Sequence, residues 1–158
     1  MENRAADMAE IEKRIQALEE ENQLLGNIIH KAPIPIFVLD RHHKISHFNQ
    51  ALEELSGFSA REMIGTDFQW KAFYGKKRPV MADLIIDGAP DDQIIALYGP
   101  KYKKALANKQ LFAATDFFPD LPPEGKWLFF TAAAVYDSTG TVAGAVETLP
   151  DVTNEKAR

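Results

Sequence analysis

Residues 37–67 read FVLDRHHKISHFNQALEELSGFSAREMIGTD. The β-branched and aromatic run that begins just before this stretch predicts a strand over residues 34–40, and residues 45–49 predict a second strand. The four residues between them, RHHK, predict a tight polar turn in which we expect the side chains of His42 and His43 to be solvated. The stretch therefore opens as a β-hairpin.

Short helices follow the hairpin. Residues 51–55 predict one helix, and Ser59 with Glu62 three positions later forms a capping box for the next helix. Residues 66–110 hold further short helical patterns that glycine and proline separate.

The last third of the chain changes to strand patterns, at residues 111–118, 127–136 and 141–149. A proline-rich loop at 119–125 and a turn at 137–140 join these strands. Together with the hairpin they predict an α+β domain with one five-stranded antiparallel sheet and short helices on one face.

A long helix is predicted before the domain. Seven positions follow one another at alternating spacings of three and four residues: Met8, Ile11, Ile15, Leu18, Asn22, Leu25 and Ile29. This pattern is typical of a coiled-coil seam, in which a buried asparagine such as Asn22 is tolerated chiefly when it meets its own copy in a parallel pair. We expect a parallel homodimer with Ile11, Ile15, Leu18, Asn22, Leu25 and Ile29 in its interface. The alternative is a single helix packed along its own domain.

The composition excludes several classes of protein. A net charge of −5 gives no broad attraction to nucleic acid. No apolar run is long enough to cross a bilayer and the N-terminus has no signal-peptide pattern, so we expect a cytoplasmic protein without a membrane partner. The chain has no cysteine, which excludes a cysteine-linked flavin and a c-type haem.

Residues 37–67 resemble the opening of a PAS domain. Residues 137–156, DSTGTVAGAVETLPDVTNEK, resemble its final hairpin and the Asp-x-Thr element, here Asp151 and Thr153, that passes a signal to an effector. The resemblance implies a PAS fold, a sensor function in bacterial signal transduction such as a two-component system, and an effector beyond residue 158 of the histidine kinase, cyclase or chemoreceptor type. The expected division is a coiled-coil helix at 1–31, a PAS sensor domain at 32–153 and the start of a linker at 154–158.

The PAS resemblance also turns one face of strand 127–136 toward a ligand cleft. Alternation places Ala132 and Ala134 on that face, where they either leave room for a ligand or are covered by large side chains from residues 69–88. In the first case the candidate ligand-binding residues are Trp70, Phe73, Tyr74, Arg78, Leu128, Phe130, Ala132 and Glu147. Arg78 would then anchor a small anion, unless it is solvated. In the second case the chain is a ligand-free dimerisation scaffold with a closed core.

Catalytic motifs are not found. The sequence has no Ser-His-Asp set, phosphate loop or HExxH motif, so we expect no enzyme, with Glu147 as a general base being the alternative. None of the four histidines lies in residues 91–107, where haem-binding PAS relatives carry an axial ligand, so haem b is disfavoured. No metal site is assigned, and the cofactor is left open.

Overall fold

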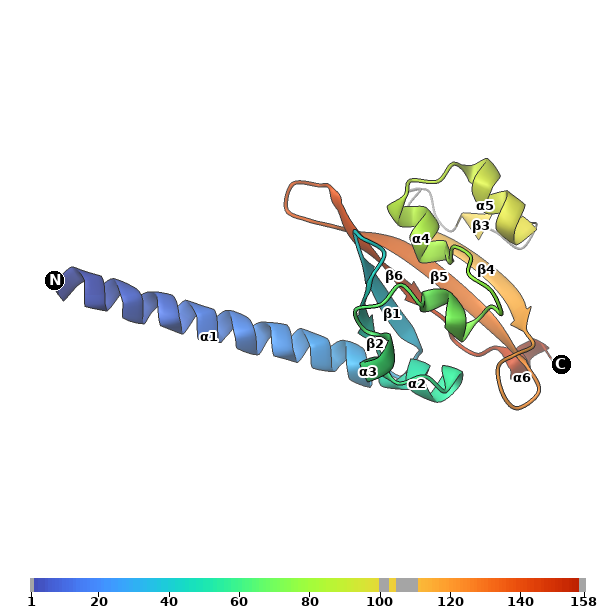
Figure 1. Ribbon diagram of the computed structural model, residues 1–158, viewed down its shortest axis with the longest axis horizontal. Coiled ribbons are helices and arrows are strands. Elements are labelled where there is room, and N and C mark those ends of the chain that lie inside the picture. The colour runs from blue at the N-terminus through green and yellow to red at the C-terminus, as the bar shows by residue number, and fades with distance from the viewer. Residues whose placement is uncertain (1, 100–102, 105–110, 157–158) are drawn as a thin grey trace.

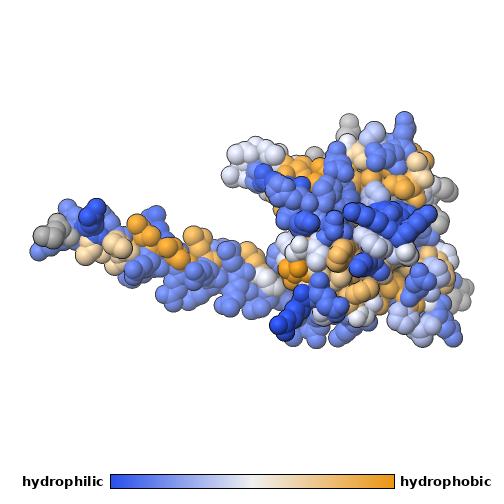
Figure 2. Space-filling model, viewed as in Figure 1, coloured by the Kyte–Doolittle hydropathy of each residue, from blue (hydrophilic) through white to orange (hydrophobic). Residues whose placement is uncertain are grey.

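A single helix, α1 (Glu2–Lys31), leads into the domain in the computed structural model, which describes residues 2–99, 103–104 and 111–156. Figure 1 shows α1 projecting away from the domain, and none of its side chains is buried. The predicted seam is visible as a hydrophobic stripe in Figure 2, with Ile11, Ile15 and Leu18 each at least half exposed. The helix therefore does not pack along its own domain. Within the described ranges, no helix is long and apolar enough to cross a membrane.

The sheet is antiparallel and has the strand order β2-β1-β6-β5-β4-β3. Its strands are β1 (Ile36–Asp40), β2 (Ile45–Phe48), β3 (Lys103–Lys104), β4 (Leu111–Phe118), β5 (Lys126–Tyr136) and β6 (Val142–Thr148). The five longer strands confirm the prediction. The two-residue strand β3 pairs with β4 and was not predicted, because two lysines in a segment with helical patterns carry no strand signal.

Short helices cover one side of this sheet. They are α2 (Gln50–Ser56), α3 (Ala60–Met63), the 3₁₀ helix η1 (Gln69–Ala72), α4 (Met81–Ile86) and α5 (Asp91–Tyr98), and α6 (Thr153–Lys156) follows the last strand. The predicted capping box is present, since Ser59 and Glu62 bond reciprocally at the start of α3. In Figure 1, α4 and α5 lie on the same side of the sheet, with α4 over β6 and β5 and α5 near β3 and β4.

The predicted register of β5 is confirmed. Leu128, Phe130 and Ala132 are buried in the core that faces the helices, as are Ala145 and Leu149, whereas Ala134 is only half-buried. Phe129 is 40% exposed on the opposite face of the sheet. A shift of one residue would exchange the two faces. Alternation separated the two sets of side chains, and the PAS resemblance indicated which set enters the core.

Asn49 joins α1 to the domain. Its side-chain oxygen accepts hydrogen bonds from the N–H groups of Ile36 (2.9 Å) and Leu52 (3.1 Å), which caps α2. Its side-chain nitrogen donates to the carbonyls of Ile29 (3.0 Å) and Ile34 (2.8 Å). One buried amide therefore holds the last turn of α1, the start of β1 and the start of α2 together.

Candidate functional site

Glu147 lies in the middle of the sheet, on β6, opposite Ala132 of β5. Its side chain is buried, and Oε1 accepts a hydrogen bond of 2.9 Å from the backbone N–H of Ala82 in the first turn of α4. Burial raises the pKa of Glu147 to about 8, against the opposing effect of the Ala82 N–H. The carboxyl group is therefore neutral at pH 7 in the folded protein and connects α4 to the sheet.

Arg78 reaches into the same region from the segment before α4. Its guanidinium carbon lies 3.9 Å from the ring centre of Tyr74 and 5.1 Å from that of Tyr98, as in a cation–π contact. Its Nε donates to the carbonyl of Pro79 at 3.2 Å. Arg78 is thus half-buried between two aromatic rings and is not the freely solvated side chain of the alternative interpretation.

Aromatic rings fill the space above the alanines of β5. Phe73 lies 5.7 Å from Phe118, and Tyr74 lies 5.8 Å from the same ring. Phe130 continues the cluster at 6.0 Å from Phe118 and 5.4 Å from Tyr98. Burial raises the pKa of Tyr74 to about 12, which keeps its hydroxyl group neutral. This packing matches the closed-core alternative over the middle of the sheet.

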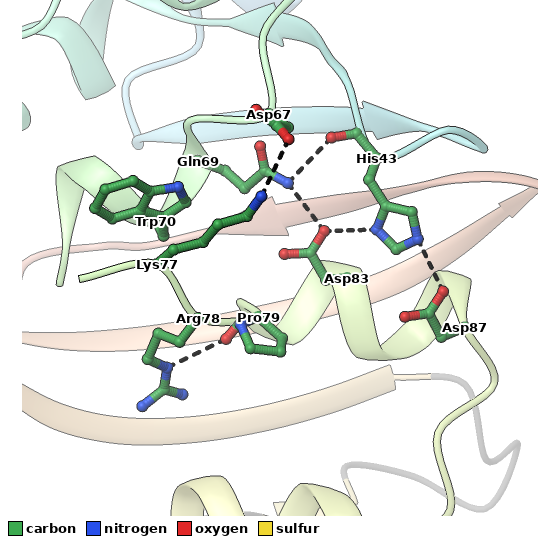
Figure 3. A pocket seen from close by; sticks show the side chains of 9 residues that line it. All are labelled: His43, Asp67, Gln69, Trp70, Lys77, Arg78, Pro79, Asp83 and Asp87. Carbon is green, nitrogen blue, oxygen red and sulfur yellow. Dashed lines mark hydrogen bonds and ion pairs between the residues drawn. The ribbon is translucent and has the colours of Figure 1, made fainter.

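A cavity of about 380 Å³ opens beside the closed core, between η1, the segment before α4, α4 itself and the β1–β2 turn (Figure 3). It is lined by His43, Asp67, Gln69, Trp70, Lys77, Arg78, Pro79, Asp83 and Asp87. Two of the candidate ligand-binding residues, Trp70 and Arg78, lie in this lining. The other six, Phe73, Tyr74, Leu128, Phe130, Ala132 and Glu147, belong to the neighbouring core and do not line the cavity.

A polar network crosses one wall of the cavity. Oδ1 of Asp83 lies 2.9 Å from Nε2 of Gln69 and 2.7 Å from Nδ1 of His43, while Oδ2 accepts from the N–H of Val80 at 2.9 Å. Nε2 of His43 lies 2.8 Å from Oδ1 of Asp87. The expectation that His43 is solvated is therefore wrong, because α4 brings two carboxylates to the turn from 40 and 44 residues away.

Three buried polar atoms in this lining have no hydrogen-bond partner among the described residues: Gln69 Oε1, Trp70 Nε1 and Arg78 Nη2. The orientation of the Gln69 amide is fixed, because its nitrogen faces two acceptors, the carbonyl of His43 at 3.1 Å and the carboxylate of Asp83. An unpaired buried polar atom costs about 1–3 kcal/mol. The residues of this lining thus carry two buried unused donors and one buried unused acceptor.

Asp151 and Thr153 lie where the chain leaves the sheet. Asp151 accepts hydrogen bonds from the backbone N–H and the hydroxyl of Thr153, and its other oxygen lies 3.0 Å from Nζ of Lys126. The Thr153 hydroxyl accepts from the N–H of Trp127 at 3.0 Å. Both residues therefore fasten the start of α6 to the first residues of β5.

The residues that sequence reasoning missed are His43, Gln69, Asp83 and Tyr98. Asp83 had a signal: it is the one charged residue in the apolar stretch VMADLII at 80–86, and a charge in such a run needs a buried partner. The histidine that supplies the partner lies too far away in the sequence for spacing to reveal it.

Comparison with known proteins agrees with this architecture. A family model described as PAS fold matches residues 29–157. The PAS domain of BvgS from Bordetella pertussis is 18% identical over 90% of this chain and 92% of that chain, with a TM-score of 0.57. A PAS domain from Colwellia psychrerythraea is 17% identical over 84% of this chain and 97% of that one, with a TM-score of 0.55.

A third structure, of an RNA-binding light-oxygen-voltage receptor, has a TM-score of 0.55 at 20% identity, and the match covers 85% of this chain but only 33% of the receptor. No curated protein matches the sequence. The strand order, the helices on one face and the family match over residues 29–157 agree with one another, and the chain belongs to the PAS fold family.

Proposed function

We propose that the chain is a cytoplasmic sensor module that binds a small anionic molecule in the cavity between η1 and α4 and passes its state to an effector. The sensor fold is consistent with a signalling module. The observation that carries the ligand proposal is Nη2 of Arg78, a buried cationic donor with no described hydrogen-bond partner, on a side chain that lines this cavity. The proposed role is binding and relay, not catalysis.

The chemistry of the lining favours a ligand with an anionic group. The guanidinium of Arg78 is held in place by Tyr74 and Tyr98 and offers the donor geometry that a carboxylate fits. Glu147 lies behind it but is neutral at pH 7, so the arginine charge is not cancelled by a buried carboxylate. Trp70 Nε1 adds a second donor, and Gln69 Oε1 would accept a bond from a hydroxyl or amide on the same ligand.

The signal route follows from the contacts of α4. This helix forms one wall of the cavity and is bonded to β6 through Glu147. Strand β6 continues to Asp151 and Thr153, where a movement would reach α6 and an effector beyond it. A ligand shifts such an equilibrium only by as much as it prefers one state, so bound and free protein should differ in the last strand. The exposed seam of α1 would hold two copies together as a parallel homodimer.

Isothermal calorimetry against a panel of small carboxylates tests the ligand proposal. A binder should lose roughly 2 kcal/mol or more of affinity in Arg78→Ala, because a buried charge-assisted bond is removed. Lys76→Ala is the matched control, since Lys76 is an exposed cation two residues earlier, and it should bind as the parent does. Equal losses in the two variants would show that only the general positive charge matters.

The ligand-free scaffold is the second candidate, and the aromatic packing over β5 favours it. Native mass spectrometry of the freshly purified protein separates the two. A mass equal to the bare chain, together with a carboxylate panel that has no binder, would support the scaffold. A retained small molecule that Arg78→Ala releases would support the sensor.

A further inference from the structure

His43 sits between two carboxylates, Asp83 in α4 and Asp87 at the C-cap of that helix, and both of its ring nitrogens face an oxygen. Nδ1 is 2.7 Å from Oδ1 of Asp83, and Nε2 is 2.8 Å from Oδ1 of Asp87 (Figure 3). An ionised carboxylate can only accept, and a neutral imidazole carries a single N–H, so only the imidazolium form donates both bonds. Asp83 also accepts from Nε2 of Gln69 at Oδ1 and from the N–H of Val80 at Oδ2, so both of its oxygens act as acceptors. The geometry is therefore that of a protonated histidine.

We propose that His43 makes this chain a proton sensor: its protonated ring holds the β1–β2 turn against α4, and loss of the proton loosens this contact. The proposal does not depend on the small-molecule ligand, because every group that it requires belongs to the chain itself. Loss of one proton removes one of the two bonds, since the neutral ring leaves a nitrogen lone pair facing a carboxylate.

The position of the ring links the β1–β2 turn to α4. His43 has a backbone φ of 65°, in the left-handed region, which aims its side chain from the tight turn toward α4. The helix that it holds also bonds Glu147 through the N–H of Ala82 and forms one wall of the 380 Å³ cavity. A proton on His43 therefore affects the same helix that the proposed ligand contacts.

The charges near the ring favour the protonated form. The charged or titratable neighbours of His43 on its own turn are Asp40, Arg41, His42 and Lys44. Asp67, Lys77 and Arg78 line the same cavity, and Asp83 of α4 and its C-cap residue Asp87 contact the ring. Lys77 pairs with Asp67 at 3.5 Å and Arg41 pairs with Asp137 at 3.5 Å, so both cations have their own anionic partners. The two groups that contact the ring are both carboxylates.

The pKa of His43 reflects this balance. Partial burial lowers it, but the hydrogen bonds and charges of Asp83 and Asp87 outweigh burial and raise the pKa above its ordinary value of 6.5. Because the folded pKa is the higher one, the contact contributes fully below about pH 6.5 and is lost as the pH rises through the raised folded value. The sensor would thus respond above pH 6.5.

Nuclear magnetic resonance of the ¹⁵N-labelled full chain tests the proposal without any ligand. At pH 6 both ring nitrogens of His43 should carry a proton, and its titration midpoint should lie above 6.5. Amide exchange of residues 81–86, corrected for the intrinsic pH dependence, should become about tenfold faster or more above that midpoint. The control His42→Asn should leave this step unchanged, because His42 is exposed on the same turn.

Asp87→Asn tests most directly whether the proton on His43 is required for the contact. The introduced amide can donate to Nε2 of a neutral ring whose Nδ1–H still donates to Asp83, so both bonds survive without the extra proton. The variant should stay folded and lose the pH-dependent step in α4 exchange. A step of unchanged size in Asp87→Asn, or a His43 midpoint at or below 6.5, would overturn the proposal.

Glu147 also contacts α4 and titrates, so the same step is measured in Glu147→Gln, whose side-chain oxygen still accepts from Ala82. The step should persist in that chain. Its disappearance would assign the effect to Glu147 and refute the role of His43.

Discussion

The backbone N–H of Ala82 donates a hydrogen bond to Oε1 of Glu147 across 2.9 Å, and this bond joins the first turn of α4 to the middle of the sheet. Both groups are buried. The bond needs only an acceptor oxygen, which the neutral carboxyl group also supplies, so a charge on Glu147 is not required for the contact. Its charge would instead be a cost, because the surroundings are largely apolar.

We expect Glu147→Gln to change how stability depends on pH. The folded pKa of about 8 lies above the ordinary value of 4.5, so the folded state holds a proton that the unfolded state has released over this interval. The free energy of unfolding of the parent should therefore fall with rising pH, by roughly 1 kcal/mol per pH unit from this group. Urea unfolding at pH 5 and pH 8 should show a smaller fall in the variant, and parallel pH profiles would contradict the buried neutral carboxyl group.

Asn49→Ala should destabilise the domain by about 3 kcal/mol or more. The change removes the cap of α2 and leaves the part-buried backbone groups of Ile29, Ile34 and Ile36 without their side-chain partner. Thermal unfolding followed by circular dichroism measures the loss. Gln50→Ala is the control at the neighbouring exposed position, where the amide only bonds Lys31, and it should change stability by less than about 0.5 kcal/mol.

Two glycine substitutions should act in opposite directions. A Cβ atom on Gly144 would lie 2.1 Å from the carbonyl oxygen of Leu39, so Gly144→Ala must push β6 away from β1. This change should lower the free energy of unfolding by about 3 kcal/mol. A Cβ atom on Gly26, near the C-terminal end of α1, meets nothing within 4 Å, and Gly26→Ala should stabilise that helix by about 1 kcal/mol. Equal effects in urea unfolding would contradict the close β1–β6 approach.

The dimer proposal predicts a position-specific effect along α1. Leu18→Lys places a charge on the exposed seam and should convert a dimer to a monomer in sedimentation velocity runs. Gln16→Lys adds the same charge at an exposed position off the seam and should remain dimeric. A parent chain that sediments as a monomer at about 50 µM, a concentration at which short helical pairs still associate weakly, would count against the coiled coil.

The sheet was largely predictable because its signals are local. Alternation along β5 puts Phe130 and Phe129 on opposite faces, and the PAS resemblance indicates that the Phe130 face is the inner one, as the structure has it. Glu147 follows the same period of two as Ala145, and both are buried on the inner face.

The cavity wall was not predictable in the same way. The contact of His43 with Asp83 depends on where α4 crosses the β1–β2 turn, and the path of residues 66–80 decides that crossing. The contact of Tyr98 was not predicted either, because its partner Phe130 lies 32 residues away on another element. Side chains that meet through loop geometry leave no periodic signal, whereas side chains that meet through strand pairing do.

The hydrogen bond of 2.9 Å from the N–H of Leu149 to the carbonyl of Pro35 places the entrance and the exit of the domain side by side. Strands β1 and β6 are paired along their length, so the chain returns to within one strand spacing of its starting point. A domain whose two ends lie this close together can be inserted into a longer chain, or removed from it, with little change in the distance between the segments on either side. A tandem duplication of residues 33–152 would then add a second domain while adding little to the end-to-end distance of the chain.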